Sequence, residues 1–196
     1  MNQKSCEALP ANYRMEKAYD FAGLSRENLI GLLISGILLV GSVLLALPGH
    51  PFLVLEGVEN PVMRLVFLAG LFAVLALSMR LQGKLAGYLT FRLCESPIEY
   101  VSMGIYILVS TGTRYIRRSS WIASALLPTL FWCAVLLCFC HALSERWFWV
   151  PFLMFVVAIS SIGGKLVGTF LMLRYPKDTY VQDDAQTLRV YTCAGE

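Results

Sequence analysis

The chain has few charged residues, and four long stretches have none at all. Asp, Glu, Lys and Arg make up 15% of the 196 residues, against about a quarter in soluble domains. The uncharged stretches cover residues 28–55, 65–79, 119–144 and 147–164. A charge at the bilayer centre costs about 2.5–3.5 kcal/mol on insertion scales. With 57% hydrophobic residues and a mean hydropathy of +0.64, this pattern excludes an ordinary soluble domain and indicates an integral membrane protein.

The predicted fold is all-α, with four transmembrane helices arranged as two tandem hairpins. The spans are expected at about residues 29–47, 62–80, 121–141 and 147–164. Each hairpin should be followed by an amphipathic interfacial helix and a short cytoplasmic strand-like segment. This divides the chain into an N-terminal tail, two hairpin units with the segments that follow them, and a C-terminal tail, at residues 1–28, 29–118, 119–176 and 177–196.

Basic residues are almost absent from one side of these spans. Of the 16 Lys and Arg, all except Arg64 and Arg146 lie in the two tails or between the second and third spans. Because loops rich in Lys and Arg stay in the cytoplasm, both termini and the middle loop are predicted to be cytoplasmic. Within that loop, residues 98–113 are rich in Ile, Val, Tyr and Thr, which fits either a strand or a further interfacial segment.

The sequence also lacks the usual signatures of transport and catalysis. The predicted spans contain no ionisable side chain, which disfavours secondary transport. No glycine-rich phosphate loop, zinc-protease motif or serine with a credible base is present. We therefore expect no enzymatic activity, no cofactor, no metal and no direct contact with nucleic acid.

Histidine is rare, and its placement leaves one alternative open. His50 and His141 are the only two, and both lie just past the outer ends of predicted helices. Two imidazoles in a four-helix bundle can ligate haem. A haem- or quinone-linked electron-transfer anchor is therefore an alternative function. A second alternative is a membrane-shaping protein whose short paired spans wedge one leaflet without crossing the bilayer.

A short motif occurs twice, at the inner ends of the second and fourth spans. It reads GKLAG at residues 83–87 and GKLVG at residues 164–168. Each copy is followed by an apolar amphipathic stretch and then by a proline and a tyrosine. This order predicts an internal duplication, although inner helix ends generally favour Gly, Lys and Arg. The repeated positions are the candidate residues of a cytoplasmic docking face: Lys84, Arg92, Pro97, Tyr100, Lys165, Arg174, Pro176 and Tyr180.

These motifs resemble a known family of membrane subunits. Gly23-Leu24-Ser25 leads into the first hairpin, with Ser25 the expected N-cap of the first span, and the two basic, proline- and tyrosine-containing exits close the hairpins. The pattern resembles the small inner-membrane subunits that accompany the ATPase of type IV (conjugative) secretion systems, the PrgI-like and TcpE-like group. The resemblance covers residues 20–101 and, more loosely, 119–181. Such subunits usually have one hairpin, whereas this chain has two.

The resemblance implies a location and a set of partners. It suggests a non-enzymatic assembly subunit of a bacterial inner-membrane complex, working in secretion or conjugation. Its hairpins would pack against other integral membrane subunits in the bilayer. A cytoplasmic protein, such as the secretion ATPase, would dock on the two exits.

Overall fold

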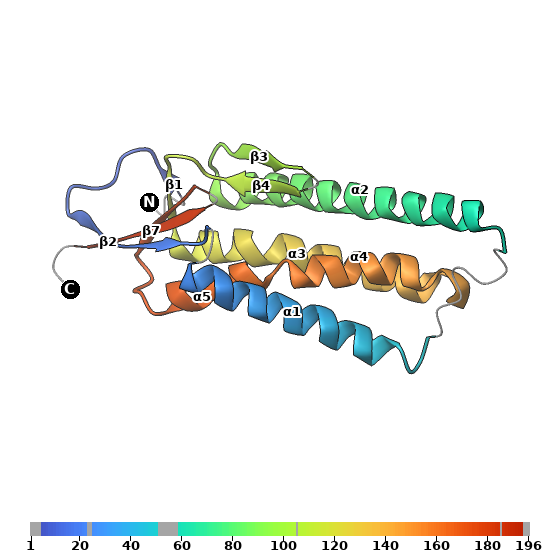
Figure 1. The fold of residues 1–196 in the computed structure, drawn as a ribbon. Helices are drawn as coiled ribbons and strands as arrows, with labels where there is room; N and C mark the ends of the chain where they lie inside the picture. Colours follow the sequence, from blue (N-terminus) through green and yellow to red (C-terminus); the bar gives the residue numbers. More distant parts are fainter. Residues whose placement is uncertain (1–4, 23–24, 51–58, 105, 185, 194–196) are drawn as a thin grey trace.

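The computed structural model of this chain describes residues 5–22, 25–50, 59–104, 106–184 and 186–193. Long apolar helices form a bundle, and a β-sheet lies at one end of it (Figure 1). The helices are α1 (Arg26–Ala46), α2 (Pro61–Cys94), α3 (Arg118–Ala142), a 3₁₀ turn η2 (Glu145–Trp147), α4 (Trp149–Ser160) and α5 (Gly163–Leu173). Gly23 and Leu24 of the lead-in motif lie outside the described residues. Ser25 does cap α1, as predicted, because its hydroxyl accepts the N–H of Asn28 at 3.3 Å.

The prediction of four helices that are long and apolar enough to span a membrane is confirmed. In the part of the chain that the structure describes, four helical segments are long and apolar enough to cross a bilayer: α1, α2, α3, and the combined segment Glu145–Leu173. The last of these is broken at Ser161 and Ile162, between α4 and α5. The first and last strands lie at the same end of the bundle as the segment between α2 and α3 (Figure 1). Both tails and the middle loop are therefore on one side of the spans.

The all-α prediction is wrong, because the tails and the middle loop fold together into sheets. Five strands form an antiparallel sheet in the order β1-β5-β6-β7-β2, and two more form a separate hairpin, β3-β4. The five-stranded sheet contains β1 (Ser5–Cys6), β2 (Tyr13–Asp20), β5 (Tyr115–Arg117), β6 (Tyr180–Asp183) and β7 (Thr187–Cys193). The hairpin contains β3 (Glu99–Met103) and β4 (Tyr106–Ser110). Residues 98–113 are thus mainly strand, which resolves the alternative left open by the sequence.

A buried apolar core attaches the five-stranded sheet to the helices. Ile116, Val181 and Val190 are fully buried and pack in one cluster with Trp121 of α3 and Met172 of α5. The strands that supply these residues come from segments far apart in the chain. Short strands of this kind become stable only when a sheet buries one of their faces. The sequence pattern therefore could not separate them from polar tails.

The separate interfacial helices of the prediction are also absent. Residues 85–93 are the last turns of α2, which continues without a break to Cys94. Residues 166–173 belong to α5, which packs against α1 and α3 inside the bundle. The amphipathic pattern reflects packing in both cases, because one face of each helical segment contacts other parts of the protein and only the opposite face is exposed.

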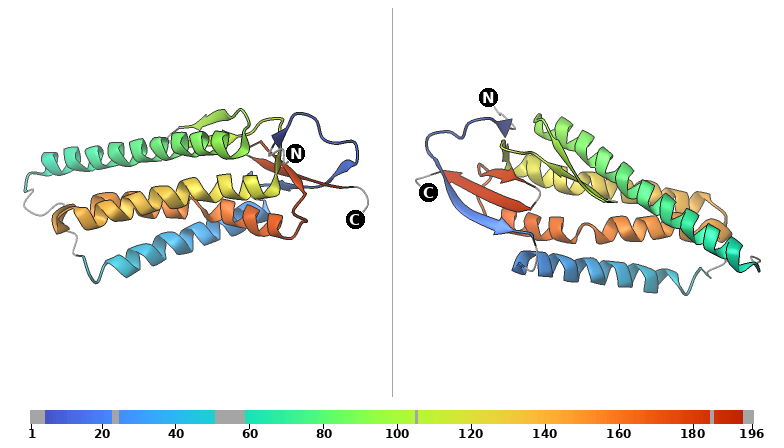
Figure 2. Two further views of the ribbon diagram at one scale, coloured as in Figure 1. Left: turned by 180° about the vertical axis from the view of Figure 1, so that it is seen from behind. Right: turned by 45° about the horizontal axis from the view of Figure 1, so that its top comes forward.

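The spatial order of the helices corrects the predicted tandem hairpins. α3 and α4 pack against each other as a hairpin, whereas α1 packs on α4 and α5, and α2 packs on α3, α4 and β4. In all views, α1 and α2 lie on opposite sides of the α3–α4 pair (Figure 2). The order of elements does repeat along the chain, as β2-α1-α2-β3-β4 and then β5-α3-α4-α5-β6-β7. The internal duplication itself stays a prediction.

Candidate functional site

A cavity of about 380 Å³ lies where the helices meet the two sheets. Its walls come from all these layers, including Gln82 of α2, Trp121 of α3, Lys165 of α5 and Asp183 of β6. Most of the remaining lining is apolar. A largely apolar hollow of roughly 300–1,000 Å³ with a few convergent polar groups is the usual form of a small-ligand site. This cavity is therefore the candidate functional site.

The glycines of the repeated motif shape the walls of the cavity. A Cβ atom on Gly83 would lie 2.8 Å from the Cβ of Ile107, and one on Gly87 would overlap the ring of Tyr100. The β3-β4 hairpin can therefore pack directly on α2. Gly168 of the second copy similarly makes room for the indole of Trp121. The small residues of the motif thus allow close packing.

A second close contact joins α1 to the break between α4 and α5. A Cβ atom on Gly163 would overlap the carbonyl oxygen of Gly31 and the hydroxyl of Ser35. The hydroxyl of Ser35 donates to the same Gly31 carbonyl at 2.9 Å. Small residues allow helix backbones to approach in lipid, where the hydrophobic effect does not drive helices together. This contact fixes the start of α5, and with it the position of Lys165.

Lys165 points into the bundle and does not lie on an exposed helix end. Its Nζ donates to the hydroxyl oxygen of Thr129 at 3.0 Å, and Gln82 Nε2 donates to the same oxygen at 3.5 Å. Thr129 is fully buried. Lys165, Thr129 and Gln82 belong to α5, α3 and α2, so these two hydrogen bonds connect three helices at a single point in the bundle. The sequence does carry one signal for this cluster, namely Thr129, which is a single polar residue in an otherwise apolar part of α3.

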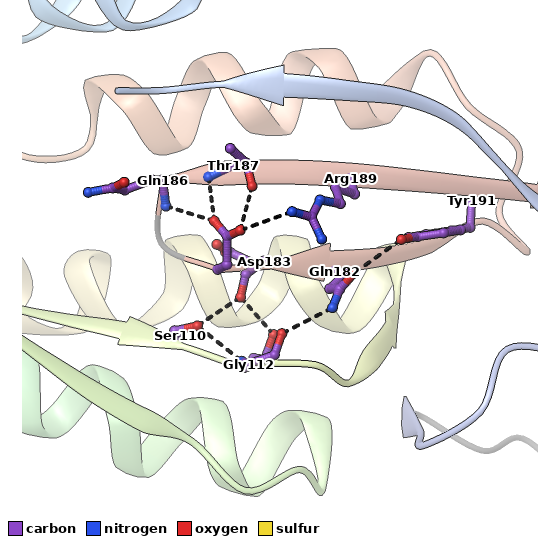
Figure 3. Close-up of polar contacts among 10 residues, drawn as sticks. Ser110, Gly112, Gln182, Asp183, Gln186, Thr187, Arg189 and Tyr191 are labelled. Carbon is purple, nitrogen blue, oxygen red and sulfur yellow. Dashed lines mark hydrogen bonds and ion pairs between the residues drawn. The ribbon is translucent and has the colours of Figure 1, made fainter. Parts of the chain in front are cut away.

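Asp183 closes the cavity on the side of the sheet. Its Oδ2 accepts the indole N–H of Trp121 at 2.8 Å. Its backbone carbonyl accepts the hydroxyls of Ser110 and Thr111 at 3.0 and 3.2 Å, which join β6 to the end of β4 (Figure 3). The carboxylate also interacts electrostatically with the ammonium group of Lys165. Sequence reasoning missed this role of Asp183.

β6 and β7 form a hairpin, and Asp184 organises its turn. The Oδ1 atom of Asp184 accepts the N–H groups of Thr187 and Gln186 at 2.6 and 3.2 Å, and Arg189 lies 3.7 Å from Oδ2 (Figure 3). Burial alone would raise the pKa of the Asp184 carboxyl. The hydrogen bonds from Thr187 and Gln186 and the charge of Arg189 outweigh burial and lower that pKa below its ordinary value.

The residues predicted to form a docking face are divided between three environments. Four of them are exposed on the last turns of α2 and the start of β3: Lys84, Arg92, Pro97 and Tyr100. Arg174 and Pro176 are exposed after α5. Tyr180 is buried in the sheet, edge-on to Tyr13, and Lys165 is in the cavity. Because α2 and α5 lie on opposite sides of α3 (Figure 1), the exposed residues form two surfaces and not one face.

The two histidines lie away from the cavity. The ring of His50 stacks on Phe148, with 3.7 Å between ring centroids, and its carbonyl accepts the indole N–H of Trp149 at 3.1 Å. His141 is exposed on the last turn of α3. The stacked Phe148 covers one face of the His50 ring. Among the described residues, the Nδ1 atom of that ring is buried without a hydrogen-bond partner, and the haem alternative stays a prediction.

Comparison of the chain with protein-family models, with curated proteins and with solved structures finds no match. The likeness to conjugative secretion subunits therefore rests on the sequence motifs alone.

Proposed function

We propose that this protein is a non-enzymatic structural subunit of a multi-protein complex in the bacterial inner membrane, with its sheet and both tails in the cytoplasm. It docks a cytoplasmic protein through one surface, formed by the end of α2 and the start of β3. The resemblance at the sequence level makes a secretion or conjugation machine the host complex and its ATPase the docked protein.

The observation that carries this proposal is the length of α2. Residues 61–80 already extend about 30 Å at ~1.5 Å per residue, which is the thickness of the hydrocarbon core. The rest of α2, up to Cys94, extends roughly another 21 Å on the same estimate. This part of the helix carries the β3-β4 hairpin along one side. A helix that continues well beyond the bilayer can present a rigid surface to a soluble partner.

The composition of that surface fits a protein-binding site. Tyr88, Phe91 and Tyr100 are 54%, 50% and 52% exposed, and Arg92 lies beside them. The Arg92 guanidinium is 5.6 Å from the centre of the Tyr88 ring, and its Nε donates to the Tyr88 hydroxyl at 3.3 Å. Aromatic residues and Arg are enriched at protein interfaces, where they contribute most of the binding energy. An acidic partner surface with an apolar groove would complement this group.

A charge reversal tests the docking surface. The Arg92→Glu variant should lose the cytoplasmic partner in co-purification from native membranes, because it repels an acidic surface and removes the cation beside Tyr88. Lys177→Glu reverses an exposed charge outside this surface and is the matched control. A photo-crosslinking residue placed at Tyr100 should label the same partner. If Arg92→Glu co-purifies as much partner as Lys177→Glu does, the docking surface is wrong.

The two alternatives have their own tests. A Soret band in the purified protein that is lost on His141→Ala would establish the haem anchor instead. A cysteine placed at Glu59, in a background without the native cysteines, reports the side on which the start of α2 lies. Labelling of that cysteine only from the cytoplasm would mean that the helices do not cross, and would favour the membrane-shaping protein.

A further inference from the structure

The cavity contains one cationic and one anionic side chain on different walls. Lys165 lies on α5, among the helices, and Asp183 lies on β6, in the sheet. Around them are the polar side chains of Gln82 and Ser161, and the rest of the lining is largely apolar. Charged groups that are removed from water need opposite charge nearby, and here the Asp183 carboxylate and the Lys165 ammonium group interact with each other across the cavity. The arrangement therefore suits a ligand that carries both charges and an apolar part.

The cavity lies between helices that face the bilayer. Asn28 of α1 and Gln82 of α2 line it from different walls. These two helices lie on opposite sides of the α3–α4 pair (Figure 2), and Asp183 of β6 lines the same cavity from the sheet.

We propose that the cavity binds the head group of a zwitterionic phospholipid with a primary ammonium group. The phosphate is held by Lys165, with the amide group of Gln82 as a further hydrogen-bond donor. The ammonium group is held by the carboxylate of Asp183, which the indole of Trp121 orients. The apolar part of the lipid extends from the cavity past Met79 toward the membrane-spanning part of α2.

The pair of charges sets the specificity. The phosphate of a purely anionic lipid would be attracted to Lys165 but repelled by Asp183. Such a lipid has no ammonium group that could pair with the Asp183 carboxylate. A choline head group carries the right charges, but its quaternary nitrogen has no N–H to donate to a carboxylate. Phosphatidylethanolamine meets both requirements. The order of affinity is therefore ethanolamine, then choline, then glycerol head groups.

An ion pair between Lys165 and Asp183 without any ligand is the competing explanation, and lipid retention separates the two. The full chain, purified in mild detergent, is loaded with phosphatidylethanolamine, phosphatidylcholine or phosphatidylglycerol, and bound lipid is counted by native mass spectrometry. Free phosphoethanolamine is a fourth probe, and it distinguishes a site for the head group alone from a site for the whole lipid. The expected result is selective retention of phosphatidylethanolamine, with weaker binding of phosphoethanolamine.

Two variants keep the hydrogen bonds and remove the charges. Lys165→Gln retains a donor for Thr129, and Asp183→Asn retains an acceptor for Trp121. Each should reduce retention by about tenfold or more, whereas Lys177→Met, which removes an exposed lysine, should bind like the original chain. Lys165→Arg preserves the positive charge and should keep most of the binding, and circular dichroism checks that each variant is folded.

Three outcomes would overturn the proposal. One is equal retention of phosphatidylglycerol and phosphatidylethanolamine, which would mean an adventitious lipid only. Another is unchanged retention in folded Lys165→Gln protein. The third is the absence of bound lipid in the original chain together with a lower unfolding temperature in both charge variants, which would establish an internal ion pair instead.

Discussion

The ammonium group of Lys165 donates a hydrogen bond to the hydroxyl of Thr129 at 3.0 Å, across the interface between α5 and α3. The hydroxyl is fully buried and also accepts from Gln82. One threonine thus satisfies polar groups from two other helices in a mainly apolar bundle. Buried polar groups of this kind are expensive to leave without partners.

Replacing Thr129 by Val should destabilise the bundle, because the ammonium of Lys165 and the amide of Gln82 both lose their acceptor. We expect a loss of about 1–3 kcal/mol, the usual cost of a buried donor left without a partner. The measurement is thermal unfolding of the purified protein in detergent. Thr113→Val, at an exposed position, is the matched control. Equal unfolding temperatures for the two variants would show that the contact contributes nothing.

Replacing Gly163 by Ala should be disruptive, since a methyl group there overlaps the Gly31 carbonyl and the Ser35 hydroxyl. Overpacking of this kind costs roughly 1–3 kcal/mol. Gly36→Ala places the same methyl group on α1 where nothing lies within 4 Å, and should be neutral or slightly stabilising because Ala favours helix. Thermal unfolding compares the pair. The close contact is refuted if Gly163→Ala is as stable as Gly36→Ala.

The stability of the five-stranded sheet should depend on pH through Asp184. Its pKa is lower in the folded chain than in the unfolded one, where a free Asp titrates near pH ~3.9. The ionised carboxylate therefore stabilises the fold above that pH, and the contribution is lost as the pH falls through the folded-state pKa. Unfolding followed from pH 7 to pH 3 should show a smaller loss in Asp184→Asn than in the original chain. Glu59→Gln, which removes an exposed carboxyl, should leave the pH profile unchanged.

The proposed orientation of the chain, with both tails in the cytoplasm, predicts the location of fused reporters. A reporter after Glu196 and one inserted near Val101 should both lie on the cytoplasmic side, because the basic residues gather at that end of the bundle. On that side a fluorescent protein fluoresces and alkaline phosphatase is inactive. Paired alkaline phosphatase and fluorescent protein fusions provide the measurement. Reporters on opposite sides of the membrane would contradict both the orientation and the proposed docking surface.

The predicted docking residues show what a repeated motif can and cannot reveal. The motif correctly marks two positions where a helix packs closely against other elements, at Gly83 and Gly168. It gives the two lysines of the motif the same role, although Lys84 is exposed and Lys165 lies in the cavity. The difference comes from the neighbours: β3-β4 covers one side of α2, whereas α5 lies between α1 and α3. The direction in which a helical side chain points is a property of the packed bundle.

The sequence by itself determined that four segments are apolar enough to enter lipid and that the basic residues gather in the tails and the middle loop, because hydropathy and the placement of charge are local properties. The tertiary structure alone decided that the tails and the middle loop form one sheet, that α1 and α2 are separated by α3 and α4, and that Lys165 faces Asp183 across a cavity. Strand pairing, such as Val181 with Val190 in register, and helix contacts depend on partners distant in the chain. No local sequence pattern specifies which strand or helix an element will contact, so these contacts are defined only in the packed structure.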